Sequence, residues 1–138
     1  MAEVAATANR AGTKQPGKVF NIILWVLQIA AAAMFLFAGT PKLLGAPQVV
    51  AVFDTIGFGQ WFRYLTGGLE IIGAILLLIP RLSGVGALLL MCVMVGAAGT
   101  HLFLIGGSPV PAIVLFLVMA LIAWARRDRT RGLLGRAQ

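Results

Sequence analysis

The sequence has little charge, one cysteine and one histidine. Of its 138 residues, only 11% are Asp, Glu, Lys or Arg, and 60% are hydrophobic. A soluble domain usually carries about 25% charged residues. So few charged side chains cannot cover a water-facing surface, which excludes a soluble enzyme and a disordered chain. The composition predicts a protein that lies in a lipid bilayer.

The scarcity of cysteine and histidine excludes several redox centres. The single thiol, Cys92, allows no internal disulfide and no Cys-x-x-Cys pair, and we expect it to pack as a small residue. The single histidine, His101, cannot supply both axial ligands of a b-type haem. The Glu-x-x-His motifs of di-iron bundles and a phosphate-binding Gly-x-x-x-x-Gly-Lys loop are absent as well. We therefore predict no catalytic residues, no metal site and no cofactor bound covalently or by metal ligation.

Long stretches without charge predict four membrane-spanning helices. A bilayer core about 30 Å thick needs about 20 helical residues. Lys, Arg, Asp and Glu are absent from residues 19–41, and a second uncharged block, 82–125, is long enough to cross twice. That block should turn at its Gly-Gly-Ser-Pro sequence, with Ser108 as the cap of the last helix and Pro109 at its first position. The expected spans are residues 19–38, 61–79, 82–104 and 109–125.

We make separate predictions for the first span, for Pro41 near its end, and for the segment that connects it to the second span. The first span follows a basic segment but is longer than the apolar part of a signal peptide, so we expect an uncleaved anchor. Pro41 should stop or kink this helix. Residues 47–56 predict a short apolar helix that lies in the membrane interface or folds back on the bundle.

The distribution of Lys and Arg predicts the orientation. Four spans place nine basic residues on the side that holds both termini, and leave only Lys42 and Arg63 on the other side. Because Lys-rich and Arg-rich loops stay in the cytoplasm, both termini should be cytoplasmic. The polar basic N-terminal tail, 1–18, and the Arg-rich tail, 126–138, then contact anionic lipid headgroups. Nucleic-acid binding is not expected, since the basic residues do not mix with aromatic residues on a soluble face.

The polar residues in or beside the spans form a candidate ligand or proton site. Charged and amide side chains are costly to bury in lipid, so they should face other helices. Their presence in a span is therefore a hypothesis for a functional site. We expect them to gather in the outer half of the bundle, with Glu70 in contact with Gln28, with a residue of the third span, or paired with Lys42. The candidates are Gln28, Lys42, Arg63, Glu70 and His101.

Each candidate also has a purely structural interpretation. Gln28 and Glu70 can simply hold helices together through interhelical hydrogen bonds. Arg63 can be an anchor that extends its charge to the membrane surface, and His101 can be a satisfied interfacial histidine. The sequence leaves these alternatives open.

An ordered set of motifs resembles the DoxX-like family of small four-helix bacterial membrane proteins. The set covers about residues 36–104 and comprises Gly39-Thr40-Pro41-Lys42-Leu43-Leu44-Gly45, Phe53, Gly57, Tyr64-Leu65-Thr66-Gly67-Gly68-Leu69-Glu70-Ile71-Ile72-Gly73-Ala74, Pro80, Met94-Val95-Gly96-Ala97 and His101. The resemblance implies a multi-pass protein of the bacterial inner membrane, with Lys42, Glu70 and His101 at the family's polar positions. The resemblance also implies protein partners. Some relatives are subunits of thiosulfate:quinone oxidoreductases, and others belong to redox or oxidative-stress assemblies. Wider relatives are membrane chaperones or cargo receptors.

Three functions follow from these observations. The first is an accessory or scaffold subunit of a quinone-linked, sulfur-linked or oxidative-stress redox assembly, with a redox protein as partner and no catalytic centre of its own. The second is a small-molecule or quinone-binding protein or transporter, in which Lys42, Arg63 and His101 supply positive charge or hydrogen bonds and Glu70 couples a proton. The third is a structural bundle or membrane chaperone. Oligomerisation is compatible with all three.

Overall fold

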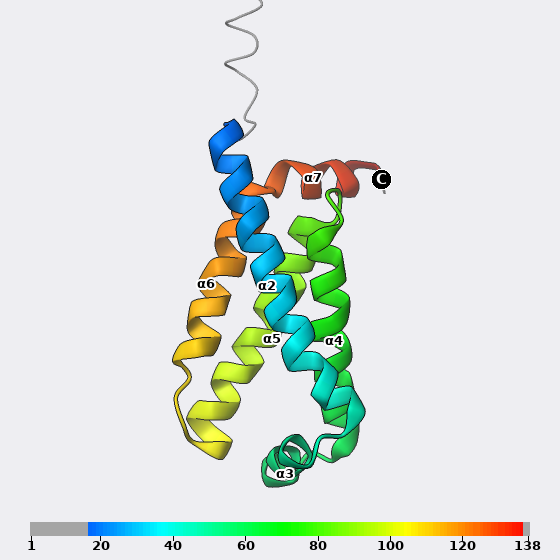
Figure 1. The fold of residues 1–138 in the computed structure, drawn as a ribbon, viewed down its shortest axis with the longest axis vertical. Helices are drawn as coiled ribbons and strands as arrows, with labels where there is room; N and C mark the ends of the chain where they lie inside the picture. Colours follow the sequence, from blue (N-terminus) through cyan, green and yellow to red (C-terminus); the bar gives the residue numbers. More distant parts are fainter. Residues whose placement is uncertain (1–16, 137–138) are drawn as a thin grey trace, which may run out of the picture.

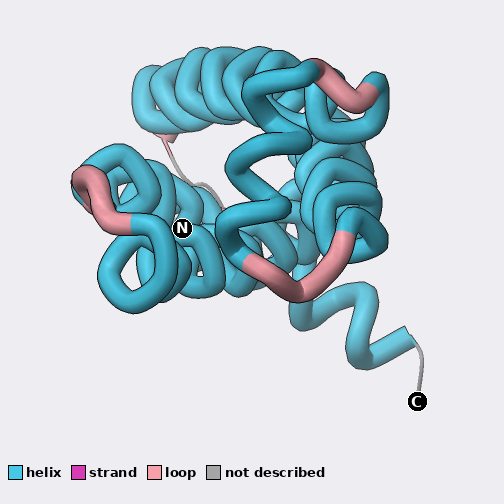
Figure 2. Tube along the Cα trace, turned by 90° about the horizontal axis from the view of Figure 1, so that it is seen from below, coloured by secondary structure: helices cyan, strands magenta, loops and turns pink. Residues whose placement is uncertain are grey.

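The computed structural model describes residues 17–136, and every regular element among them is a helix (Figures 1 and 2). The all-α class is thus confirmed. Four helices run along the bundle and two short ones lie at its ends. The elements are α2 (Lys18–Leu44), α3 (Pro47–Ile56), α4 (Gln60–Leu78), α5 (Ser83–Thr100), the π-helical turn η1 (His101–Ile105), α6 (Val110–Ala125) and α7 (Arg127–Arg136).

The long helices have the length and composition of membrane spans. Three are long and apolar enough to cross a bilayer: Lys18–Leu44 with 27 residues, Gln60–Leu78 with 19, and Ser83–Ile105 with 23. The pair α6 and α7, bent by 64°, gives a fourth candidate. Large apolar side chains point outward, with Phe37 83% exposed and Phe103 84% exposed. A surface of this kind is covered by lipid, so the chain is a membrane protein.

Pro41 does not stop the first helix, which was one of the two outcomes expected for it. The helix α2 continues three residues beyond it to Leu44, and ends where Gly45 adopts a left-handed φ of 75°. The carbonyl of Pro41 accepts hydrogen bonds from the backbone N–H groups of Gly45 and Ala46, at 3.0 and 3.1 Å. A proline in the last turn removes only one backbone hydrogen bond, which the continuing helix tolerates. Lys42 therefore stays on α2.

The start of α6 also differs in detail from the expectation. Pro109 caps the helix instead of occupying its first position, and the Ser108 hydroxyl accepts a hydrogen bond from the N–H of Val110 at 3.2 Å. Before this turn, α5 widens into η1, and Gly106 and Gly107 then take φ values of 71° and 78°. These values favour glycine, which allows the chain to reverse here.

Close helix packing brings the polar residues together. A Cβ added to Gly67 of α4 would lie 2.8 Å from the Cβ of Lys42 on α2, and one added to Gly73 would lie 2.5 Å from the Leu90 side chain on α5. Small residues at such positions let helix backbones approach each other in a membrane. In Figure 1, the start of α2, the α4–α5 turn and α7 lie at one end, and α3 lies at the other.

Candidate functional site

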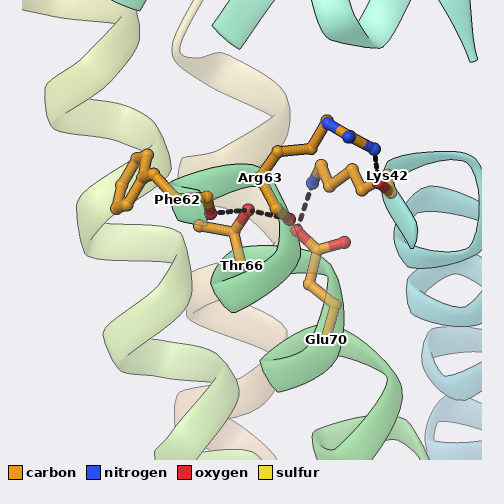
Figure 3. A network of polar contacts seen from close by, with 5 residues as sticks. All are labelled: Lys42, Phe62, Arg63, Thr66 and Glu70. Atoms are coloured by element: carbon orange, nitrogen blue, oxygen red, sulfur yellow. Dashed lines mark hydrogen bonds and ion pairs between the residues drawn. The ribbon is translucent and has the colours of Figure 1, made fainter. Parts of the chain in front are cut away.

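An ion pair joins α2 to α4 near the end where α3 lies. The ammonium of Lys42 donates to Oε1 of Glu70 (Figure 3), and this is the one salt bridge within residues 17–136. The Glu70 side chain is 4% exposed and that of Lys42 is 22% exposed. The second carboxylate oxygen, Oε2, is buried and has no hydrogen-bond partner among the described residues. The carboxylate is thus almost fully buried but not fully satisfied, whereas the ammonium is partly exposed.

Arg63 supports this pair from behind. Its guanidinium donates to the backbone carbonyl of Lys42 and, through Nε, to Oε1 of Gln60 at 2.7 Å. The group also lies 4.3 Å from the centre of the Tyr64 ring. Arginine at a helix C-terminus satisfies a free carbonyl and complements the helix dipole. The buried Arg63 side chain therefore holds the C-terminal end of α2 in place, and so positions Lys42.

His101 reaches the site from η1. Its Nδ1 lies 3.0 Å from the carbonyl oxygen of Gly106. A carbonyl only accepts hydrogen bonds, so Nδ1 carries the proton, and in the neutral ring Nε2 is an acceptor. The preceding residue, Thr100, donates its hydroxyl to the carbonyl of Gly96 at 2.7 Å. Thr100 is thus held by its own helix and His101 by the residue that follows η1, and the Thr100 hydroxyl keeps acceptor capacity.

These residues line a common cleft of about 160 Å³, which we call the outer cleft. Its polar lining comes from three elements, α2, α4 and the α5–η1 segment. Apolar and aromatic side chains form most of the remaining wall. The lining residues are Lys42, Val52, Phe53, Ile56, Phe62, Thr66, Glu70, Val93, Gly96, Ala97, Thr100, His101 and Ile105. Of the five predicted candidates, three line the outer cleft, and Arg63 holds one of these three in place.

Gln28 belongs to a different cluster, so the expected contact between Gln28 and Glu70 is wrong. The side chain is fully buried, and its Nε2 donates to the carbonyl of Leu77 at 2.8 Å. Its Oε1 accepts from Nε of Arg126 at 2.9 Å. Because α2 and α4 run antiparallel, Lys42 lies beside Glu70, whereas Gln28 lies two turns further along α4 at Leu77.

Arg126 is a buried residue that the sequence analysis placed in the tail. It is 2% exposed, and its Nη1 donates to Oδ1 of Asn21 at 2.8 Å. Its guanidinium also lies 5.7 Å from the ring centre of Trp25. Asn21 and Gln28 are seven residues apart on one face of α2. Two amide side chains on one face of a membrane helix need a polar partner, and this is the sequence signal that could have pointed to Arg126.

Other expectations concern isolated residues. Cys92, which was expected to pack as a small residue, is exposed on α5. Within residues 17–136, no three His, Cys, Asp or Glu side chains come close enough together to hold a metal ion.

The outer cleft can bind an amphipathic molecule through hydrogen bonds and one ion pair. An ammonium has three donors, and Glu70 takes one of those on Lys42. The Thr66 hydroxyl lies 3.0 Å from the carbonyl oxygen of Phe62 and 3.2 Å from that of Arg63, so it is fixed and keeps acceptor capacity. The cleft thus offers a donor and several acceptors beside apolar walls.

One comparison with known proteins, the family match, agrees with the motifs. The model of the DoxX-like family matches residues 26–126, which include all of α3, α4, α5 and the outer cleft. No curated protein and no solved structure matches the chain.

Proposed function

This chain belongs to the DoxX-like family, and we propose that it is a multi-pass protein of the bacterial inner membrane that binds a molecule of the quinone class in the outer cleft. It does so as an accessory, non-catalytic subunit of a membrane redox assembly. The observation that carries the proposal is the Lys42–Glu70 pair, which lines an otherwise largely apolar cleft.

The shape and chemistry of the outer cleft favour a quinone head group. Its 160 Å³ is smaller than the roughly 300 Å³ at which pockets for drug-sized ligands begin, so it suits one ring of a longer molecule. Phe53, Phe62 and Val93 supply apolar walls for such a ring. The free donors of Lys42 suit a quinone carbonyl, which only accepts hydrogen bonds.

The pair is more than a link between helices. Buried polar groups that serve only structure are nearly always satisfied by hydrogen bonds. Oε2 of Glu70 has no partner among the described residues, and the pair borders a cleft instead of being sealed by side chains. Nη2 of Arg126 is also buried without a partner, so it is the open cleft beside the Lys42–Glu70 pair that favours a ligand-binding role over interhelical packing alone.

The accessory role follows from what the side chains can and cannot do. Lys42, Glu70 and His101 can hold a quinone and exchange a proton with it, but none of them carries electrons. Electrons would therefore come from a partner redox protein. The resemblance to the DoxX-like family supports this partner, because it implies relatives that are subunits of redox assemblies.

Ligand-dependent stability tests the binding site. Thermal unfolding in mild detergent would be followed with a short-chain benzoquinone or naphthoquinone, and separately with thiosulfate and sulfite. A ligand at a hundred times its Kd stabilises the folded state by about 2.7 kcal/mol, which is a measurable rise in Tm. Lys42→Gln should abolish the rise with quinone, whereas Lys18→Gln, an equal loss of charge on an exposed residue of α2, should retain it. No rise with quinones, or a rise with the sulfur oxyanions alone, contradicts the proposal.

Co-purification tests the accessory role separately. The tagged chain, expressed at native level and extracted in mild detergent, should retain a redox protein whose identity is read by mass spectrometry. A chain that always purifies alone contradicts this part of the proposal and favours a structural bundle.

A further inference from the structure

The helix α7 is fixed across the end of the bundle opposite the outer cleft. It leaves α6 at an angle of 64°, and Figure 1 shows it beside the α4–α5 turn. Arg126, at the bend, is buried and bonded to Gln28 and Asn21. A Cβ on Gly84 would lie 2.1 Å from Oγ1 of Thr130, so α7 is seated closely on the start of α5. This basic segment is therefore a docked helix.

A cleft of about 330 Å³ lies between α7 and the α4–α5 turn. Pro80 and Arg81 line it from the turn, and Arg129, Gly132 and Leu133 line it from α7. Nη1 of Arg129 donates to the carbonyl of Pro80 at 2.8 Å, which ties the two walls together. A guanidinium has five N–H donors, so most of those on Arg129 stay available, as do those of Arg81.

No carboxylate within residues 17–136 forms a salt bridge in this cleft, and the exposed Asp128, which precedes Arg129 on α7, does not line it. The salt bridge between Lys42 and Glu70 is the only one in that range, and it lies near the other end. Both Arg81 and Arg129 are exposed. Two arginines that share a cleft without a carboxylate partner form a site for an oxyanion, with phosphate matching the guanidinium geometry best.

We propose that this cleft binds the head group of an anionic phospholipid, with the phosphodiester held between Arg81 and Arg129. The adjoining surface favours a lipid over free phosphate. Leu78 and Ile79, just before Pro80, are 41% and 38% exposed and provide an apolar surface for acyl chains. A helix that lies across the end of a membrane bundle, as α7 does in Figure 1, suits the membrane interface, where lipid head groups lie. The site is separate from the outer cleft and does not require a ligand there.

Lipid binding to the purified protein tests the site. The affinities of phosphatidylglycerol, phosphatidylcholine and inorganic phosphate would be measured by native mass spectrometry in detergent. Arg81→Gln together with Arg129→Gln should weaken phosphatidylglycerol binding by about 30-fold, from the effect of two basic residues at a lipid surface. The control, Lys18→Gln with Arg131→Gln, removes the same charge from exposed residues that do not line the cleft, and should bind as the wild type does.

Four outcomes would overturn the proposal. An equal loss in the control pair would show general attraction between charges. Phosphatidylcholine bound as tightly as phosphatidylglycerol would show that the head-group charge is not recognised, and inorganic phosphate bound as tightly would show a site for the free ion. Arg81→Lys with Arg129→Lys preserves charge and folding while removing the planar donors, and should bind several-fold more weakly; wild-type affinity in that variant also contradicts the site.

Discussion

The Lys42–Glu70 pair predicts that removing one partner harms the protein more than removing both. Lys42→Met leaves a carboxylate that is 4% exposed, and neither of its oxygens then has a partner among the described residues. Glu70→Leu leaves an ammonium that is 22% exposed and lies two residues before the end of α2. The ammonium can reach water at the membrane surface, whereas the carboxylate cannot.

This asymmetry sets the expected free energies of unfolding. Breaking a buried ion pair by removing one partner costs about 3–5 kcal/mol, which we expect for Lys42→Met. Leaving the better exposed ammonium unpaired should cost about 1–3 kcal/mol. Replacing both partners with apolar residues of similar volume is often close to neutral. The double variant should therefore be more stable than Lys42→Met, with a coupling energy of at least about 2 kcal/mol.

The four proteins of this cycle would be compared by reversible unfolding in mixed detergent micelles. Glu70→Gln, which retains the shape and one acceptor, serves as the conservative variant. It should keep the fold and lose ligand binding. The reasoning is refuted if the double variant loses the sum of the two single losses, since that would mean the two side chains do not interact.

Three further predictions follow from the fold. Reporter fusions at Gly107 and Gln138 should report opposite sides of the membrane, with Gln138 cytoplasmic; the same side for both would break the four-span topology. Gly73→Ala should destabilise the protein by about 1–3 kcal/mol, because its Cβ would lie 2.5 Å from a leucine on α5, whereas Gly68→Ala has open space and should stabilise it by up to about 1 kcal/mol. If Gly73→Ala and Gly68→Ala changed the stability equally in thermal unfolding, the close packing of α4 on α5 at Gly73 would be contradicted. Arg126→Met should cost about 1–3 kcal/mol by leaving the buried amide oxygen of α2 without its donor, and a neutral effect would show that the group is hydrated.

Composition was sufficient to predict the helical class and the membrane environment. Uncharged runs of about 20 residues have few alternatives, because lipid requires every backbone hydrogen bond to be made within a helix. The short helix at residues 47–56 was also predicted, and the structure has it as Pro47–Ile56. Pro41 was misleading, because a proline in the last turns of a helix removes only one backbone hydrogen bond, which the helix tolerates.

The partners within the polar clusters could not be predicted from periodicity. Helical spacing tells which residues of one helix share a face, but it does not give the register between two antiparallel helices. This register decides that Glu70 meets Lys42 and that Gln28 meets Leu77. Arg126 was missed for a related reason, because a run of basic residues at the end of a span is normally solvated. The amide side chains of Asn21 and Gln28 draw it into the bundle.

The central claim, that the outer cleft holds a quinone, is tested most directly by photoaffinity labelling. A short-chain quinone with a photoreactive group on its ring would be cross-linked to the protein in native membranes, and the labelled peptides identified by mass spectrometry. We expect labelling of cleft-lining residues on α3, α4 and the α5–η1 segment, with loss of the label in Lys42→Gln and competition by unlabelled quinone. Labelling that is confined to the lipid-facing surface, or that is unchanged in Lys42→Gln, would contradict the claim.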